Sequence, residues 1–160
     1  MTMQMPAGHE VLSEDRLIRR LEKLMTELQL DRGEFVIFGS GPLLAHGLRR
    51  SIHDLDIVAR GATWQRALEH GLAARGTVNG APIAQFWGGL IQFSAGWVSA
   101  DWNPNALIDQ AEIVQGLPFA RLADVLAYKL ELCRPKDRPD IAALLYELRQ
   151  PDYRTLPGCR

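Results

Sequence analysis

Two aspartates, Asp54 and Asp56, are separated by one apolar residue and followed by an apolar pair, Ile57-Val58. In a β-strand, residues i and i+2 project from the same face, about 6–7 Å apart. Both carboxylates can therefore bind one divalent cation, or two that lie close together. Oxygen ligands of this kind favour Mg²⁺ or Mn²⁺, which usually complete their coordination with water and substrate phosphates. The pair predicts a metal site for phosphate chemistry.

A glycine-rich turn, Gly39-Ser40-Gly41, lies upstream of the aspartates, between an apolar run that ends at Phe38 and a proline, Pro42. Proline is favoured in the first turn of a helix. The backbone N–H groups at a helix start attract phosphate. The turn therefore predicts an anion site, and together with the aspartates it indicates nucleotide phosphate chemistry.

Two other nucleotide motifs fit this turn less well. A dinucleotide-binding loop needs G-x-G-x-x-G and an acidic residue near the end of the following strand. Leu44 occupies the position of the third glycine, and the aspartates precede the apolar Ile57-Val58 instead of following it. A Walker loop needs Gly-Lys-Ser/Thr, and the sequence contains no such triplet.

The order of these motifs resembles that of the nucleotidyltransferase superfamily, which has the polymerase-β-like fold. An apolar strand, the Gly39-Ser40 pair, thirteen residues and then Asp54-Leu55-Asp56-Ile57 follow one another as in that family. The segment 47–51 is similar to the Gly-x-Arg-x-Ser/Thr lead-in of its small prokaryotic members, including the minimal and abortive-infection-toxin types. A later block, 122–141, is similar to their helix-loop-helix. The resemblance covers roughly residues 34–148.

The resemblance implies roles for the residues that match the motifs. Gly39 and Ser40 would hold the phosphates of a nucleoside triphosphate, and Asp54 and Asp56 would bind the metal, Mg²⁺ or Mn²⁺. The implied reaction is in-line attack of an acceptor hydroxyl on the α-phosphate, with pyrophosphate as the leaving group.

Basic residues gather at two places, Arg49-Arg50 and the segment 134–138. They are either solvated loops or a clamp that faces the aspartates and binds a triphosphate. We take Arg50 and Lys129 as candidate nucleotide ligands. The alternative for Lys129 is an exposed helix face.

The resemblance also implies a third carboxylate, in a strand that soon follows a glycine. In the matching stretch, 89–93, the expected position holds Gln92. An amide is a neutral ligand and cannot act as a general base near neutral pH. Asp101 is the nearest acid that could replace it as a catalytic residue. We expect Gln92 to lie beside Asp56, near any bound nucleotide, in a slow or non-catalytic member.

Two functions from different classes follow. The first is metal-dependent transfer of a nucleoside monophosphate to an acceptor hydroxyl on a small molecule, a protein or a tRNA end. The alternative is a catalytically weakened nucleotide-binding module that acts with a partner protein, as in a toxin–antitoxin or defence pair, or as a homo-oligomer. A pure interaction domain is a third alternative, disfavoured by the two aspartates.

The whole chain sets wider limits. Its 160 residues fit a single domain. The net charge of −1 argues against strong general affinity for nucleic acid. No apolar stretch is long enough for a membrane span, and the N-terminus lacks a secretory signal pattern. We therefore expect a cytoplasmic protein without membrane contact.

The hydrophobic pattern predicts the elements that position these residues. We expect an α/β (mixed α+β) fold with a central twisted sheet flanked by helices, a C-terminal helical pair at 120–149, a flexible segment at 1–12 and an irregular tail at 150–160. The expected strands are 34–38, 54–59, 81–87, 90–97 and 111–114, with 98–102 as an extension. The expected helices are one capped by Ser13, 42–48, one capped by Thr63, 106–110, 122–132 and one capped by Asp137.

Overall fold

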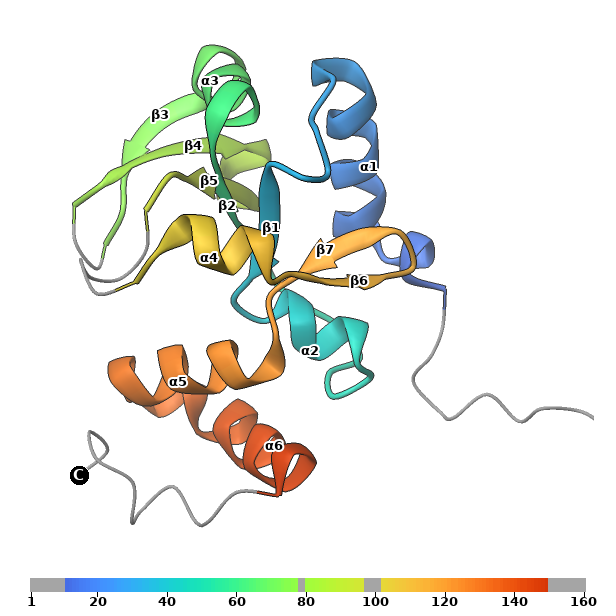
Figure 1. Cartoon of the computed structure of the whole chain (residues 1–160), viewed down its shortest axis with the longest axis vertical. Helices are drawn as coiled ribbons and strands as arrows, with labels where there is room; N and C mark the ends of the chain where they lie inside the picture. The colour runs from blue at the N-terminus through green and yellow to red at the C-terminus, as the bar shows by residue number, and fades with distance from the viewer. Residues whose placement is uncertain (1–10, 78–79, 97–101, 150–160) are drawn as a thin grey trace, which may run out of the picture.

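The computed structural model describes residues 11–77, 80–96 and 102–149, and a single mixed sheet lies at its centre (Figure 1). The seven strands of this sheet follow the order β3-β4-β5-β2-β1-β7-β6. Their bounds are β1 Phe35–Phe38, β2 Leu55–Ala59, β3 Leu72–Arg75, β4 Pro82–Phe86, β5 Ile91–Ser94, β6 Glu112–Val114 and β7 Leu117–Phe119.

The central strands combine both pairing directions. β1 is antiparallel to β2 and parallel to β7, while β2 is parallel to β5. The outer pairs β3–β4, β4–β5 and β6–β7 are antiparallel. The expected α/β class with a central mixed sheet is confirmed, and β6, the strand predicted at 111–114, forms one edge of it.

Helices cover both faces of the sheet, and two of them form a C-terminal pair, α5 and α6, below it in Figure 1. The α-helices are α1 Arg16–Leu28, α2 Gly41–Ala45, α3 Gly61–His70, α4 Pro104–Asp109, α5 Leu122–Leu132 and α6 Arg138–Leu148. Three short 3₁₀ helices are η1 Leu12–Glu14, η2 Trp87–Gly89 and η3 Pro135–Asp137. The predicted C-terminal helical pair is therefore confirmed. In the described part of the chain, no helix is long and apolar enough to cross a membrane.

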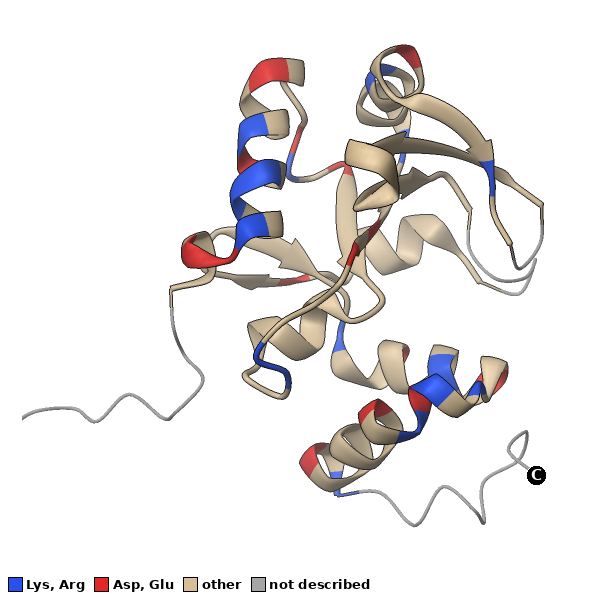
Figure 2. Cartoon of the chain, turned by 180° about the vertical axis from the view of Figure 1, so that it is seen from behind, with Lys and Arg blue, Asp and Glu red and all other residues tan. Residues whose placement is uncertain are grey.

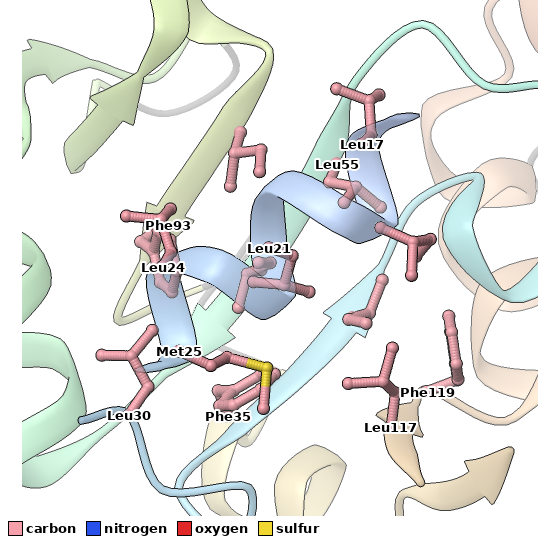
Figure 3. Close-up of a cluster of buried hydrophobic side chains, with 14 of the residues drawn as sticks. Leu17, Leu21, Leu24, Met25, Leu30, Phe35, Leu55, Phe93, Leu117 and Phe119 are labelled. Carbon is pink, nitrogen blue, oxygen red and sulfur yellow. The ribbon is translucent and has the colours of Figure 1, made fainter. Parts of the chain in front are cut away.

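Alternate residues of the central strands enter two separate cores, because side chains on a strand alternate between faces. Phe35 and Ile37 of β1 pack with α1, and Figure 3 shows Leu21 and other α1 side chains over this face. Val36 and Phe38 pack into a second core with α4, α5 and α6. All four β1 residues are fully buried. The strand that leads into the Gly39-Ser40 turn is therefore held by packing on both faces of the sheet.

The structure corrects several details of the predicted elements. Asp15, not Ser13, caps α1, and its carboxylate accepts hydrogen bonds from the backbone at the start of the helix. Thr63 lies inside α3, where its hydroxyl accepts a hydrogen bond from the Asp31 backbone N–H. Leu12 is buried in η1, although the sequence predicts a flexible segment there. The expected irregular tail and most of the extension at 98–102 lie outside the described residues.

Candidate functional site

Asp54 and Asp56 line one cavity of about 200 Å³ between the sheet and the C-terminal helical pair. Asp56 lies in β2 and is half-buried, while Asp54 immediately precedes β2 and is exposed. The predicted convergence of the two side chains therefore holds. The cavity is lined by Asp54, Asp56, Gly76, Thr77, Ala81, Ile83, Gln92, Phe93, Ser94, Gly96, Tyr128, Arg134 and Lys136.

The two carboxylates repel each other. Burial and the nearby charge of Asp54 raise the pKa of Asp56 from 3.8 to about 6, although Lys129, Arg134 and Lys136 act in the opposite direction. A divalent cation between two such carboxylates would remove this repulsion. Mg²⁺ is commonly held by one or two carboxylates together with substrate phosphates, so the aspartate pair fits that ion.

Gly39 gives the Asp56 carboxylate its space. Phe38, at the end of β1, pairs with Asp56 across the sheet, so the turn that follows lies against the carboxylate. Gly39 has φ +64°, and a Cβ atom there would lie 2.9 Å from Oδ2 of Asp56. Any larger residue would therefore be strained in its backbone and would displace the carboxylate.

Ser40 stands at the start of α2, as the sequence predicts, and its hydroxyl already has protein partners. It accepts a hydrogen bond from Nη1 of Arg49 at 2.9 Å and donates one to Oδ2 of Asp140 at 3.4 Å. Arg49, and not the expected Arg50, is thus the arginine beside the turn. Arg50 is exposed and is not among the cavity's lining residues. Phosphate binding by Ser40 and Arg50 stays a prediction.

Lys129 is buried, with 3% exposure, so the alternative of an exposed helix face is wrong. Its ammonium group lies 3.3 Å from Asp137 and 3.1 Å from Asp140. Asp137 stands at the N-cap position of α6, as the sequence predicts, but its carboxylate makes no capping hydrogen bond and accepts one from Lys129 instead. Lys129 acts on Asp56 through its charge and is not among the residues that line the cavity.

Two residues of the predicted basic clamp, Arg134 and Lys136, line the cavity with the aspartates. Arg134 is held by Asp137 through contacts of 2.7 and 3.2 Å. Burial opposes ionisation of Asp137, but Arg134 and Lys129 outweigh it and lower the pKa of this carboxyl. Asp137 therefore stays charged and fixes the guanidinium at the edge of the cavity. Arg138, the third basic residue of the segment, is exposed.

Tyr128 is a lining residue that the sequence did not single out. Its ring packs edge-on against Phe38, with centroids 5.2 Å apart. Burial raises the pKa of its hydroxyl to about 12, so the side chain stays neutral at ordinary pH. The sequence signal that could have found it is its helical spacing of three residues from the apolar Val125, which is buried on the same helix.

Gln92 lies where the sequence predicts, opposite Asp56 in the parallel pairing of β2 with β5. Its amide lines the cavity and donates a hydrogen bond to the Gly89 carbonyl at 3.2 Å. The competing candidate, Asp101, lies outside the described residues. Within 11–77, 80–96 and 102–149, no group of three or more His, Cys, Asp or Glu side chains is placed to hold a metal ion. The described acids of the cavity are Asp54 and Asp56.

Together these features define an α/β protein with a paired-carboxylate, cation-lined cavity between its sheet and its helical pair. Comparison with models of known protein families gives no match, and comparison with curated proteins gives none either.

Proposed function

We propose that this chain binds a nucleoside triphosphate together with Mg²⁺ or Mn²⁺ and transfers the nucleoside monophosphate to an acceptor hydroxyl. The observation that carries the proposal is the composition of one cavity. Two carboxylates, Asp54 and Asp56, and two cations, Arg134 and Lys136, line the same space of about 200 Å³. Carboxylates alone would repel a triphosphate. Cations alone could bind the phosphates but would not explain why a partly buried carboxylate, Asp56, lines the same cavity.

Each residue has a distinct part in binding. Arg134 and Lys136 donate charge-assisted hydrogen bonds to phosphate oxygens, and Asp137 keeps the guanidinium in place. Gly39 lets the Asp56 carboxylate lie against the turn. A bound divalent cation supplies charge neutralisation for the phosphates. The finer fold assignment, the nucleotidyltransferase fold, is part of this proposal and is supported by the Gly-Ser turn beside the aspartate strand.

The transfer forms a bond between the acceptor oxygen and the α-phosphorus and breaks the bond from that phosphorus to the oxygen bridging to the β-phosphate. Pyrophosphate leaves. The acceptor proton passes to water, because both described acids of the cavity are assigned to the metal. Such a site lacks the contribution of a positioned base, which is typically about 10²–10⁴-fold. We therefore expect slow turnover.

The second candidate is a nucleotide-binding module that has lost catalysis and acts with a partner protein. Gln92 favours it, because a neutral amide stands beside Asp56 where the resembled family carries an acid. This candidate uses the same cavity and the same ion but makes no covalent product.

Transfer of label tests the two candidates. The chain is incubated with each α-labelled nucleoside triphosphate, Mg²⁺ and a cell extract, and the small-molecule, protein and RNA fractions are then counted. Covalent label that is absent with Asp54→Asn supports transfer. Magnesium-dependent binding without label supports the second candidate. Failure of both binding and labelling would overturn both.

A further inference from the structure

A second cavity, of about 310 Å³, lies beside the start of α1. His53 lines it, whereas the neighbouring Asp54 lines the first cavity. Its other described lining residues with polar side chains are Asp15, Arg16, Arg20 and Ser51. One oxygen of the Asp15 carboxylate accepts hydrogen bonds from two backbone N–H groups of α1, and Arg16 and Arg20 are the cationic groups with the strongest attraction for an anionic ligand.

A row of basic side chains continues from this cavity along α1. Arg16, Arg19, Arg20 and Lys23 recur at helical spacing and form the α1 stripe, visible as blue bands at successive turns of α1 in Figure 2. Like charges three and four residues apart do not stabilise a helix. Among the described residues, Lys23 has an ion pair with Glu27, at 3.8 Å, and no ion pair holds the three arginines. The three arginines are therefore available to pair with an anionic ligand.

Trp87 lies against the α1 stripe. The guanidinium carbon of Arg20 lies 5.5 Å from the centroid of its ring, which is 41% exposed. Trp87 has φ +50°, a left-handed conformation that is costly for a residue with a Cβ atom and natural for glycine. Its ring contacts Phe86, with centroids 6.3 Å apart, but Trp87 is not part of either described hydrophobic core.

We propose that the α1 stripe, the second cavity and Trp87 form a binding surface for single-stranded nucleic acid. Arginines neutralise backbone phosphates, and an exposed indole ring stacks on a base. The combination favours nucleic acid over an acidic peptide, which would match the charges but not the aromatic ring. The inference goes beyond the proposed nucleotide chemistry and does not rest on it. The net charge of the whole chain is −1, so the attraction is confined to this surface. The binding weakens with salt, because each phosphate contact releases counterions.

Fluorescence anisotropy with a labelled single-stranded RNA of about ten nucleotides tests this proposal. The protein carries Asp54→Asn and Asp56→Asn, so that metal-dependent binding in the first cavity does not contribute. We expect Arg16→Gln with Arg19→Gln to weaken binding at least about tenfold and to lower the slope of log K against log salt by about 1.4, or 0.7 per lost phosphate contact. Trp87→Gly, which suits the left-handed backbone, should weaken binding about tenfold.

Two matched controls test whether any loss of exposed arginines or of an exposed aromatic ring weakens binding. Arg121→Gln with Arg149→Gln removes two exposed arginines elsewhere, and Tyr146→Ala removes an exposed aromatic ring on α6. Both should leave the affinity unchanged. The proposal is overturned if the RNA does not bind, if the controls weaken binding as much as the surface variants, or if polyglutamate binds as tightly as the RNA. The last result would assign the surface to an acidic protein.

Discussion

Burial and the neighbouring Asp54 disfavour the charged form of the Asp56 carboxyl. The pKa of this carboxyl rises from 3.8 to about 6 on folding, so the folded chain binds its proton more tightly than the unfolded chain between these values. Stability therefore falls as pH rises through this window, and the loss is complete above about pH 6. A change of this size corresponds to a cost of at most about 3 kcal/mol.

Replacing Asp56 with Asn should remove that cost. In EDTA near neutral pH, we expect Asp56→Asn to raise the free energy of unfolding by about 1–3 kcal/mol, with the gain vanishing near pH 4. Urea unfolding at several pH values measures the difference. Lower stability of the variant at neutral pH would show that the carboxylate has a structural role instead.

Gln92 and Asp101 are the two candidates for the position of the third carboxylate. If it occupies the third-acid position, Gln92→Glu adds a base beside Asp56 and should raise transfer by about 10²-fold or more. Gln85→Glu is the matched control, because Gln85 pairs with Gln92 in the sheet but does not line the cavity. Flat or reduced transfer, together with loss of activity in Asp101→Asn, would assign the role to Asp101.

At the scale of elements, the Gly39 turn and β2 act as one unit. Gly39→Ala strains a left-handed backbone and brings a methyl group within 2.9 Å of the Asp56 carboxylate. We expect a loss of about 1–2 kcal/mol in stability and a fall of roughly tenfold or more in nucleotide affinity. Gly80 has φ +69° with no atom within 4 Å of an added Cβ, so Gly80→Ala should show the first effect alone. Urea unfolding and calorimetry measure the two effects, and equal nucleotide affinity in both variants would contradict the account.

The sequence predicted the central elements because their signals are local. The apolar run into Gly39 and the alternation around Asp56 predicted β1 and β2, and the register then placed Gln92. β3 was missed because its two alanines have low strand propensity, and β7 because Pro118 indicates a break. Tertiary pairing with β4 and with β1 and β6 forms these strands instead.

For the candidate site, too, local patterns were predictable and contacts between distant elements were not. Asp54, Asp56 and Gln92 depend on strand spacing, so their meeting in one cavity was predictable. The partners of Lys129 were not, because Asp140 reaches it only when two helices pack together. The same packing places Tyr128 over the cavity.

At the scale of the whole molecule, a largely buried ionic network joins the helical pair to the Gly-Ser turn and the segment after α2. Lys129 binds Asp137 and Asp140, and Asp140 in turn contacts Arg49 at 3.6 Å and Ser40 of the Gly-Ser turn. Lys129→Met leaves two buried carboxylates without this partner. We expect a loss of about 3–5 kcal/mol in stability.

Lys136→Met provides the contrast, because Lys136 is exposed and lines the cavity. It should change stability by less than about 0.5 kcal/mol yet weaken triphosphate binding roughly tenfold or more. Chemical unfolding and nucleotide titration of both variants measure this difference. Similar stability losses in the two variants would show that the buried network is not what holds the helical pair.

The central claim is that two aspartates and two cations bind a nucleoside triphosphate through a divalent ion. Calorimetric titration with ATP, GTP, CTP and UTP, first with Mg²⁺ and then with EDTA, tests it most directly. The account predicts that at least one nucleotide binds with Mg²⁺, that EDTA abolishes binding, and that Asp54→Asn does the same while the chain stays folded. Binding that is indifferent to the chelator and to Asp54→Asn, or no binding by any nucleotide, would contradict the account.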